Sequence, residues 1–223
     1  MVSCPMRSSH RDGYQEVLAA AQAMARTGLS AGTSGNVSAR LDDGLIVITP
    51  TALPYDQMTV DDLVLLTPDG EQLAGHRQPS SEVALHLACY RAFDEIGSVL
   101  HSHPPYATMF ACARQPVPAV IDEAVLFLGG GIPVAGYAMS GTAAVGANAV
   151  RVLGDNGSAL LANHGMVTVA AGPSAAVHQA GVAEHCARVA WGVRALGGHA
   201  RLPDDSIDSL GDSYRAARRD RLR

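Results

Sequence analysis

Apolar residues follow two periods along this chain, one typical of helices and one typical of strands. Helical spacing covers residues 12–27, 79–93, a stretch after residue 103, 142–153 and 173–196. Short apolar runs between turn-forming residues predict strands at 37–41, 45–49, 63–67, 96–100, 125–128, 158–162 and 166–170. Strands follow one another directly near both ends, without a regular strand-helix alternation. We therefore expect an α/β fold in which helices flank a central mixed, mainly antiparallel sheet.

Length and apolar content predict a single domain. With 223 residues, of which 48% are hydrophobic, the chain can bury a core without disulfides. We expect one domain over residues 1–223, with its core at about 12–197 and a C-terminal tail at about 198–223. The four cysteines form no Cys-x-x-Cys pair, which favours reduced thiols. Since neither a signal peptide nor an apolar run of membrane-spanning length is visible, a cytoplasmic protein is expected.

The charged residues count against two classes of partner. The formal net charge is −5, so neither nucleic acid nor a membrane is expected. Arginines gather only in the tail, at positions 215, 218, 219, 221 and 223, where a solvated C-terminal helix explains them. All 16 basic residues are arginine, so no lysine amine can form a Schiff base with a carbonyl substrate. A reaction through a carbanion would need a metal or an added cofactor.

Two histidines close an apolar run in the middle of the chain. On a strand, His101 and His103 point to one face because side chains alternate, and they lie roughly 7 Å apart along it. His164 ends a second apolar run, and Gly165 after it allows a tight turn. Three neutral imidazoles with an open position are the ligand set of catalytic zinc, whereas structural zinc is usually closed by four protein ligands. These histidines are therefore a candidate catalytic metal site.

Three loops of small residues offer groups that bind an anion without lysine. They cover residues 32–36, 49–51 and 80–82, and the last lies at a predicted helix N-terminus. Each loop by itself is typical of an ordinary turn or cap. Together with the three histidines they predict a phosphate site. Gly-x-Gly-x-x-Gly is missing, which counts against a dinucleotide site.

Five motifs, in this order, resemble the class II aldolase and adducin family, and within it the L-fuculose-1-phosphate aldolase-like enzymes. The resemblance covers roughly residues 12–197 and rests on GTSGNVS at 32–38, TPT at 49–51, PSSE at 79–82, HSH at 101–103 and NHG at 163–165. It implies that His101, His103 and His164 bind zinc, which Glu82 also approaches when substrate is absent. The residues that it assigns to the substrate phosphate are Gly35, Asn36, Thr51, Ala52, Ser80 and Ser81.

The resemblance also implies a reaction and an assembly. The reaction is zinc-dependent, reversible cleavage of a ketose 1-phosphate, L-fuculose 1-phosphate or a related deoxyketose 1-phosphate, to dihydroxyacetone phosphate and a short aldehyde. Glu82 would move the carbon-bound proton, whereas without the histidines it would be interpreted as a helix-capping carboxylate. The family further implies a homotetramer with active sites between adjacent subunits.

The chain departs from the family pattern at three places. Family members have Thr-Gly where this chain has Thr51 and Ala52, which alters one backbone approach to the phosphate. They have a catalytic tyrosine where this chain has Asp122, which either handles the proton of the aldehyde oxygen in a neighbouring subunit's site or is a solvated loop acid. Tyr214 either matches the C-terminal tyrosine that closes over the site or is an exposed residue of the tail. His86 is expected to pack beside the site rather than to bind metal.

Other activities of the family give the alternatives. Ribulose-5-phosphate 4-epimerase, which cleaves and rejoins the same kind of bond, carries aspartate where this chain has Glu82, so the aldolase is favoured. A dehydratase or decarboxylase of the family is a further alternative. Adducin-like members keep the fold as interaction modules but lose the metal ligands. The three histidines and Glu82 count against that interpretation.

Overall fold

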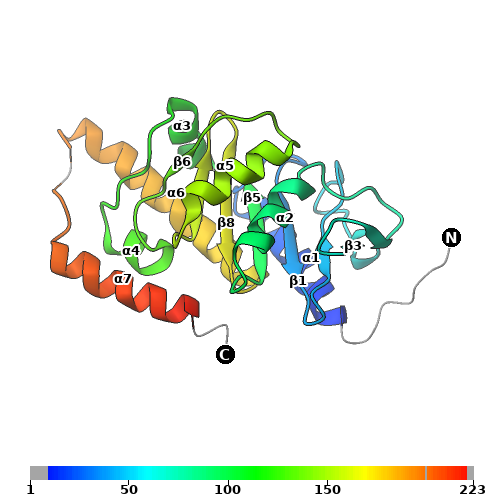
Figure 1. Ribbon diagram of the computed structural model, residues 1–223. Coiled ribbons are helices and arrows are strands. Elements are labelled where there is room, and N and C mark those ends of the chain that lie inside the picture. Colours follow the sequence, from blue (N-terminus) through cyan, green and yellow to red (C-terminus); the bar gives the residue numbers. More distant parts are fainter. Residues whose placement is uncertain (1–9, 199, 220–223) are drawn as a thin grey trace.

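One eight-stranded sheet runs through the computed structural model, which describes residues 10–198 and 200–219 (Figure 1). Its order is β4-β3-β2-β1-β5-β8-β7-β6, and all neighbouring strands are antiparallel except β6 and β7. The expected mixed, mainly antiparallel sheet is confirmed. The strands are β1 (Asn36–Arg40), β2 (Ile46–Ile48), β3 (Val64–Leu66), β4 (Gln72–Ala74), β5 (Ser98–Ser102), β6 (Val134–Ala135), β7 (Ser158–Leu161) and β8 (Gly165–Ala170).

Helices cover both faces of this sheet. Buried side chains of α1 (Arg11–Arg26), α3 (Pro105–Ala113), α4 (Asp122–Leu128) and α6 (Pro173–Ala195) share one core with one face. Those of α2 (Val83–Ala92) and α5 (Ala143–Leu153) share a second core with the other face. A 3-10 turn, η2 (Val60–Asp62), precedes β3. Within the described residues, no helix combines the length and the apolar character that a membrane span needs.

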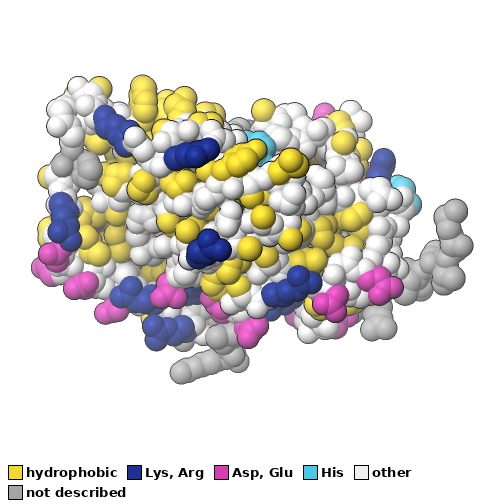
Figure 2. Space-filling view, turned by 45° about the horizontal axis from the view of Figure 1, so that its top comes forward, with side chains coloured by type: hydrophobic (Ala, Val, Ile, Leu, Met, Phe, Trp, Pro, Cys, Tyr) yellow, Lys and Arg dark blue, Asp and Glu magenta, His cyan; other side chains and the backbone are white. Residues whose placement is uncertain are grey.

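The C-terminal helix α7 (Asp204–Arg219) packs against α4 and is anchored by a charged side chain. Arg218 is only 8% exposed, and its Nε donates to Oε1 of Glu95 over 2.7 Å while its Nη1 donates to the carbonyl of Asn156 over 3.1 Å. The expectation of a solvated arginine cluster is therefore wrong for Arg218, because Glu95, in the turn before β5, offers it a carboxylate. Arg221 and Arg223 lie outside the described residues. Figure 2 shows arginine and acidic side chains intermixed along the lower edge rather than a single basic face.

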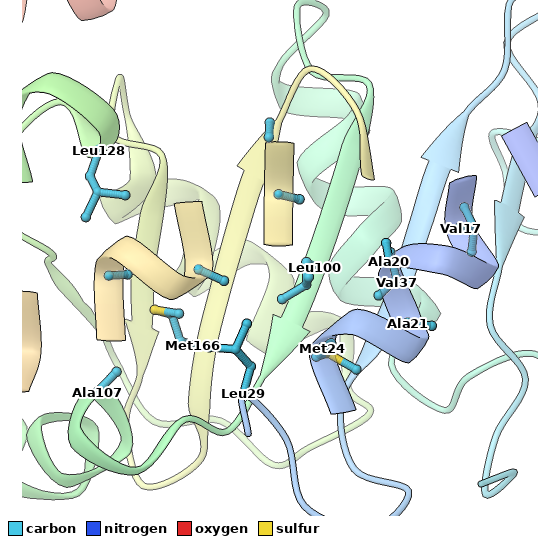
Figure 3. Close-up of a cluster of buried hydrophobic side chains, with 14 of the residues drawn as sticks. Val17, Ala20, Ala21, Met24, Leu29, Val37, Leu100, Ala107, Leu128 and Met166 are labelled. Carbon is cyan, nitrogen blue, oxygen red and sulfur yellow. The ribbon is translucent and has the colours of Figure 1, made fainter. Parts of the chain in front are cut away.

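Side-chain alternation on the central strands separates the two cores. Leu100 of β5 packs into the core shared with α1 and α6, together with Met166 of β8 (Figure 3). Val99, one residue earlier, packs into the core under α2 and α5. Because His101 has the same parity as Val99, its imidazole points to the side of the sheet that α2 covers. This alternation places His101 beside the start of α2.

The structure corrects the prediction around residue 125. Residues 125–128 belong to helix α4, and the predicted strand there is wrong. A run of four apolar residues is too short for its period to distinguish helix from strand. Asp122 and Glu123 lie in the first turn, where acidic side chains favour a helix N-terminus, and Gly129 ends the helix with left-handed backbone. The hydrophobic pattern also misses β4 and β6, since strands of two or three residues carry little periodicity.

Candidate active site

The three candidate ligand histidines meet at one end of the central strands. His101 lies in β5 and His103 directly follows it, so strand alternation turns both rings to the same face. His164 lies in the turn between β7 and β8, and the pairing of β8 with β5 brings this turn beside them. The ring centroids are 4.6, 4.7 and 5.1 Å apart. We refer to these three residues as the histidine group.

The nitrogen atoms of the histidine group converge in a way that fits a cation. His101 Nδ1 lies 3.0 Å from the carbonyl oxygen of Met166, so this nitrogen carries a hydrogen, and Nε2 is the ring atom that faces the other histidines. That Nε2 lies 2.8 Å from Nε2 of His103 and 2.8 Å from Oε2 of Glu82. One ligand atom from each imidazole lies within 4.8 Å of the others. A divalent metal that accepts nitrogen and oxygen ligands satisfies all of these acceptors at once.

The surroundings keep two imidazoles of the histidine group neutral. Burial and the neighbouring imidazoles lower the pKa of His103 to about 4. Burial, together with His101, also lowers the pKa of His164. Since metals bind the neutral imidazole, His103 and His164 are in their ligating form at neutral pH.

Glu82 stands just before α2 and turns its carboxylate toward the histidine group. It occupies the cap position, one residue before the helix begins at Val83, but its side chain makes no capping hydrogen bond. Instead, Ser140 Oγ donates to Oε1 over 2.7 Å, and Asn36 Nδ2 donates to Oε2 over 3.4 Å. Burial acts to raise the pKa of Glu82, but the hydrogen bond and charge of His101 and the Ser140 hydroxyl outweigh it and hold this pKa well below its ordinary value. An ionised carboxylate therefore lies next to the candidate metal ligands.

A pocket of about 150 Å³ opens beside Glu82. All three small-residue loops contribute to its wall, and all six residues that the resemblance assigns to the phosphate lie on it. No lysine or arginine is among the lining residues, so hydroxyls, an amide and backbone N–H groups are the donors that an anion would meet. The lining residues are Thr33, Ser34, Gly35, Asn36, Pro50, Thr51, Ala52, Ser80, Ser81, Glu82, His103, Ser140 and His164.

Backbone hydrogen bonds hold two of the loops together. The N–H of Ser80 donates to the carbonyl of Thr49 over 3.1 Å, and the N–H of Thr51 donates to that of Gln78 over 3.1 Å. Ala52 has a φ of 55°, the left-handed conformation that glycine adopts most easily. The expected change in the backbone approach at Ala52 is therefore small, since the alanine keeps a glycine-like backbone.

The third loop approaches the strand that carries the ligands. Gly35 has a φ of 83°, and a Cβ added there would lie 2.8 Å from the carbonyl oxygen of His101. Only glycine combines this backbone conformation with this close approach. Asn36 follows at once as the first residue of β1, whose pairing with β5 sets it opposite His101. The loop is thus held against the histidine group by the sheet itself.

Asp122 does not join these residues within one chain. It is exposed in the first turn of α4 and is not among the residues that line the pocket. In the segment before it, Val117 forms an isolated bridge with Ile132. A catalytic role for Asp122 therefore requires a neighbouring subunit and stays a prediction.

Tyr214 lies at the other end of the strands. It is 7% exposed, so it is not the exposed tail residue that one interpretation expected. It packs against Gly129 and lines a cavity with Ile96 and Ala170, at the start of β5 and the end of β8. His101 is five positions after Ile96, which is roughly 16 Å along a strand. Within one chain, Tyr214 therefore packs between α7 and the body of the chain, away from the histidine group. Its expected role of closing over the active site stays a prediction.

Sequence reasoning missed Ser140, which lies between β6 and α5. Its residue type and the following Gly141-Thr142 suggest only an ordinary turn before a helix. His86 is fully buried beside the site and is not part of the histidine group, as expected. It contacts the side chains of Asn36 and Ser38.

Comparison with known proteins agrees with this geometry. The family model of the class II aldolase and adducin N-terminal domain matches residues 15–191. A 5-deoxy-D-ribulose 1-phosphate aldolase from Bacillus thuringiensis is 33% identical over 201 residues, covering 90% of this chain and 94% of the relative. The L-ribulose-5-phosphate 4-epimerase UlaF from Salmonella paratyphi B is 35% identical over 195 residues, covering 82% and 85%. The solved structure of an L-fuculose 1-phosphate aldolase has a TM-score of 0.87 at 31% identity, covering 92% and 96%.

Proposed function

Since the chain belongs to the class II aldolase and adducin family, we propose that it is a zinc-dependent aldolase. The proposed reaction is reversible cleavage of a ketose 1-phosphate to dihydroxyacetone phosphate and a short aldehyde. The observation that carries the proposal is the convergence of the histidine group, Glu82 and the anion-binding loops on one pocket. An adducin-like interaction module does not require metal ligands beside an anion-binding pocket, so the convergence favours an enzyme.

Three neutral imidazoles would hold the zinc, with Glu82 as a further oxygen ligand when no substrate is bound. When bound, zinc supplies a Lewis acid that polarises the ketose carbonyl and stabilises negative charge on the substrate oxygens. This contribution replaces the lysine Schiff base that the chain cannot form.

The phosphate would be bound by the donors of the three loops. The donors that line the pocket are the hydroxyls of Thr51, Ser80 and Ser81, the amide of Asn36 and the backbone at Gly35. They would bind the substrate at its phosphate end and so orient it for cleavage.

Glu82 would move the proton in the reaction. In the cleavage direction, the C4 hydroxyl would give its proton to Asp122 of a neighbouring subunit, the C3–C4 bond would break, and the electron pair of that bond would stay with the three-carbon fragment that carries the phosphate. C3 of this fragment would then take up a proton from Glu82, whose carboxylate gains it from water, and Asp122 would return its proton to water. In the synthetic direction, the carboxylate removes the same proton, and its depressed pKa keeps it in the basic form.

We extend the proposal to a cytoplasmic homotetramer in which a neighbouring subunit brings Asp122 to the site. Exposed large apolar side chains support an interface, namely Met109, Leu126, Tyr137, Met139 and Trp191. Figure 2 shows hydrophobic side chains spread over the upper part of the visible face. Light scattering of the purified protein tests the assembly, and a monomeric mass would contradict it.

The decisive experiment is a panel of ketose 1-phosphates offered to the zinc-loaded protein. We expect dihydroxyacetone phosphate to be released from at least one of the L-fuculose, L-rhamnulose and 5-deoxyribulose 1-phosphates. The similarity to the Bacillus thuringiensis enzyme favours the last of these. Because UlaF is also similar, L-ribulose 5-phosphate is included. Its epimerisation, with no release of dihydroxyacetone phosphate from any ketose 1-phosphate, would replace the aldolase by the epimerase.

A further inference from the structure

His86 is a fully buried titratable residue that the proposed reaction does not use. It lies on α2, one helical turn after Glu82. Its Nε2 lies 2.5 Å from Oδ1 of Asn36, and its Nδ1 lies 2.7 Å from Oγ of Ser38. The same Oγ lies 2.8 Å from the hydroxyl oxygen of Tyr90. Together with the bond from Asn36 to Glu82, these contacts form one buried row of hydrogen bonds that ends at the candidate active site.

The direction of each hydrogen bond in this row follows from the atoms that face each other. The amide nitrogen of Asn36 faces Oε2 of Glu82 and donates to it, whereas Oδ1 of Asn36 faces His86. Burial lowers the pKa of His86 to about 3, so the ring is neutral and carries one hydrogen. Since Oδ1 accepts, that hydrogen is on Nε2. Nδ1 then accepts from Ser38, whose oxygen accepts from the hydroxyl of Tyr90.

We propose that His86 is a positioning residue that fixes the orientation of the Asn36 amide and so makes Asn36 a donor to an oxyanion in the pocket. One hydrogen of the amide nitrogen goes to Glu82, which leaves the other for the pocket that Asn36 lines. With the amide reversed, the carbonyl oxygen of Asn36 would face both Glu82 and the bound anion. Its partial negative charge would be repelled by both, and neither would receive a hydrogen bond from Asn36. The inference rests on the proposed function only in naming the substrate phosphate as that oxyanion.

The tautomer of His86 tests this inference without any substrate. In ¹⁵N spectra of histidine-labelled protein, with the signals of His86 identified by their loss in His86→Gln, we expect a neutral ring protonated on Nε2 throughout the neutral pH range. A ring protonated on Nδ1 would reverse the row and refute the inference, even if the protein is an aldolase.

Phosphate binding tests the consequence. Inorganic phosphate, titrated calorimetrically into the zinc-loaded protein, should bind about 10- to 100-fold more weakly to His86→Leu, as expected when a hydrogen bond to a charged group is lost. His86→Gln, which can still donate to Asn36, should recover most of the affinity, and His185→Leu is the matched control on exposed α6 surface. In an Asn36→Leu background, His86→Leu should have no further effect.

Equal losses from His86→Leu in both backgrounds would mean that His86 acts on the fold generally rather than through Asn36. An unchanged phosphate affinity in the single variant would remove the positioning role. Neither result depends on which sugar phosphate is cleaved, so failure of the inference is distinguishable from failure of the proposed function.

Discussion

Replacing Glu82 by glutamine separates proton transfer from every other property of the site. The amide has nearly the size of the carboxylate but cannot take up a proton at neutral pH. General acid and base groups typically contribute 10²- to 10⁴-fold to turnover, which is about 2.7–5.4 kcal/mol of activation free energy. We therefore expect the turnover number of Glu82→Gln to fall within this range.

The same substitution has a smaller, predictable effect on stability. Ser140 donates to one carboxylate oxygen of Glu82 and Asn36 donates to the other. A glutamine accepts at one end only, so its NH₂ group must face one of these donors. An unmet buried donor costs about 1–3 kcal/mol, and the free energy of unfolding should fall by that amount. Zinc content should not change, since the histidine group is intact.

The assay is release of dihydroxyacetone phosphate, followed with a coupled dehydrogenase, beside metal analysis and urea unfolding. Glu184→Gln is the matched control, because the carboxylate of Glu184 also accepts two hydrogen bonds, from the backbone N–H groups of Tyr106 and Ala107, but does not line the pocket. It should lose stability and keep its turnover. Wild-type turnover in Glu82→Gln would reduce Glu82 to a structural residue and refute the proton-transfer argument.

Four further predictions concern other parts of the site and the fold. Alanine at any position of the histidine group should remove zinc and nearly all activity, measured by metal analysis after dialysis, because two imidazoles hold the ion poorly; wild-type zinc content would contradict the assignment. Ser140→Ala should lower turnover about 10-fold with unchanged KM and zinc content, and Ser140→Thr should restore it, because the hydroxyl orients Glu82. Asp122→Asn should slow turnover without affecting zinc or phosphate binding if a neighbouring subunit brings it to the site, whereas wild-type kinetics would make it a solvated acid. Arg218→Met should lower the free energy of unfolding, measured in urea, by about 1–3 kcal/mol and leave turnover unchanged, because Arg218 anchors α7 far from the histidine group. A fall in turnover would indicate that α7 contributes to the active site.

The hydrophobic pattern predicts most of the sheet and the placement of two of the three candidate ligands. Strand alternation acts over two residues, so the placement of His101 and His103 on one face follows from their spacing alone. His164 requires more, because its position depends on the pairing of β8 with β5, which the sequence indicates only through the family motifs. Local periodicity therefore predicts that the two histidines at the end of β5 share a face. The third ligand also requires the pairing of β8 with β5.

Contacts that depend on packing between helices are not visible in the sequence. Ser140 reaches Glu82 because α5 packs closely on α2, where a Cβ added to Gly146 would lie 2.6 Å from Cβ of Ala88. Arg218 is buried because α7 packs near the turn before β5, which carries Glu95. Neither the turn before α5 nor the arginine-rich tail carries a signal that distinguishes these contacts from solvated ones.

The two ways in which the site residues are held predict that the proposed metal binding and the proposed proton transfer are separable. The histidine group is held by strands and by the turn between them, whose geometry is set by backbone hydrogen bonds of the sheet. Glu82 and Ser140 are held by α2 and by the segment before α5, whose distance is set by helix packing. A change in the α2–α5 contact therefore shifts Glu82 relative to its hydrogen-bond donor and leaves the metal ligands in place. Substitutions at that contact should slow the reaction before they release the metal, whereas those in the sheet should do the reverse.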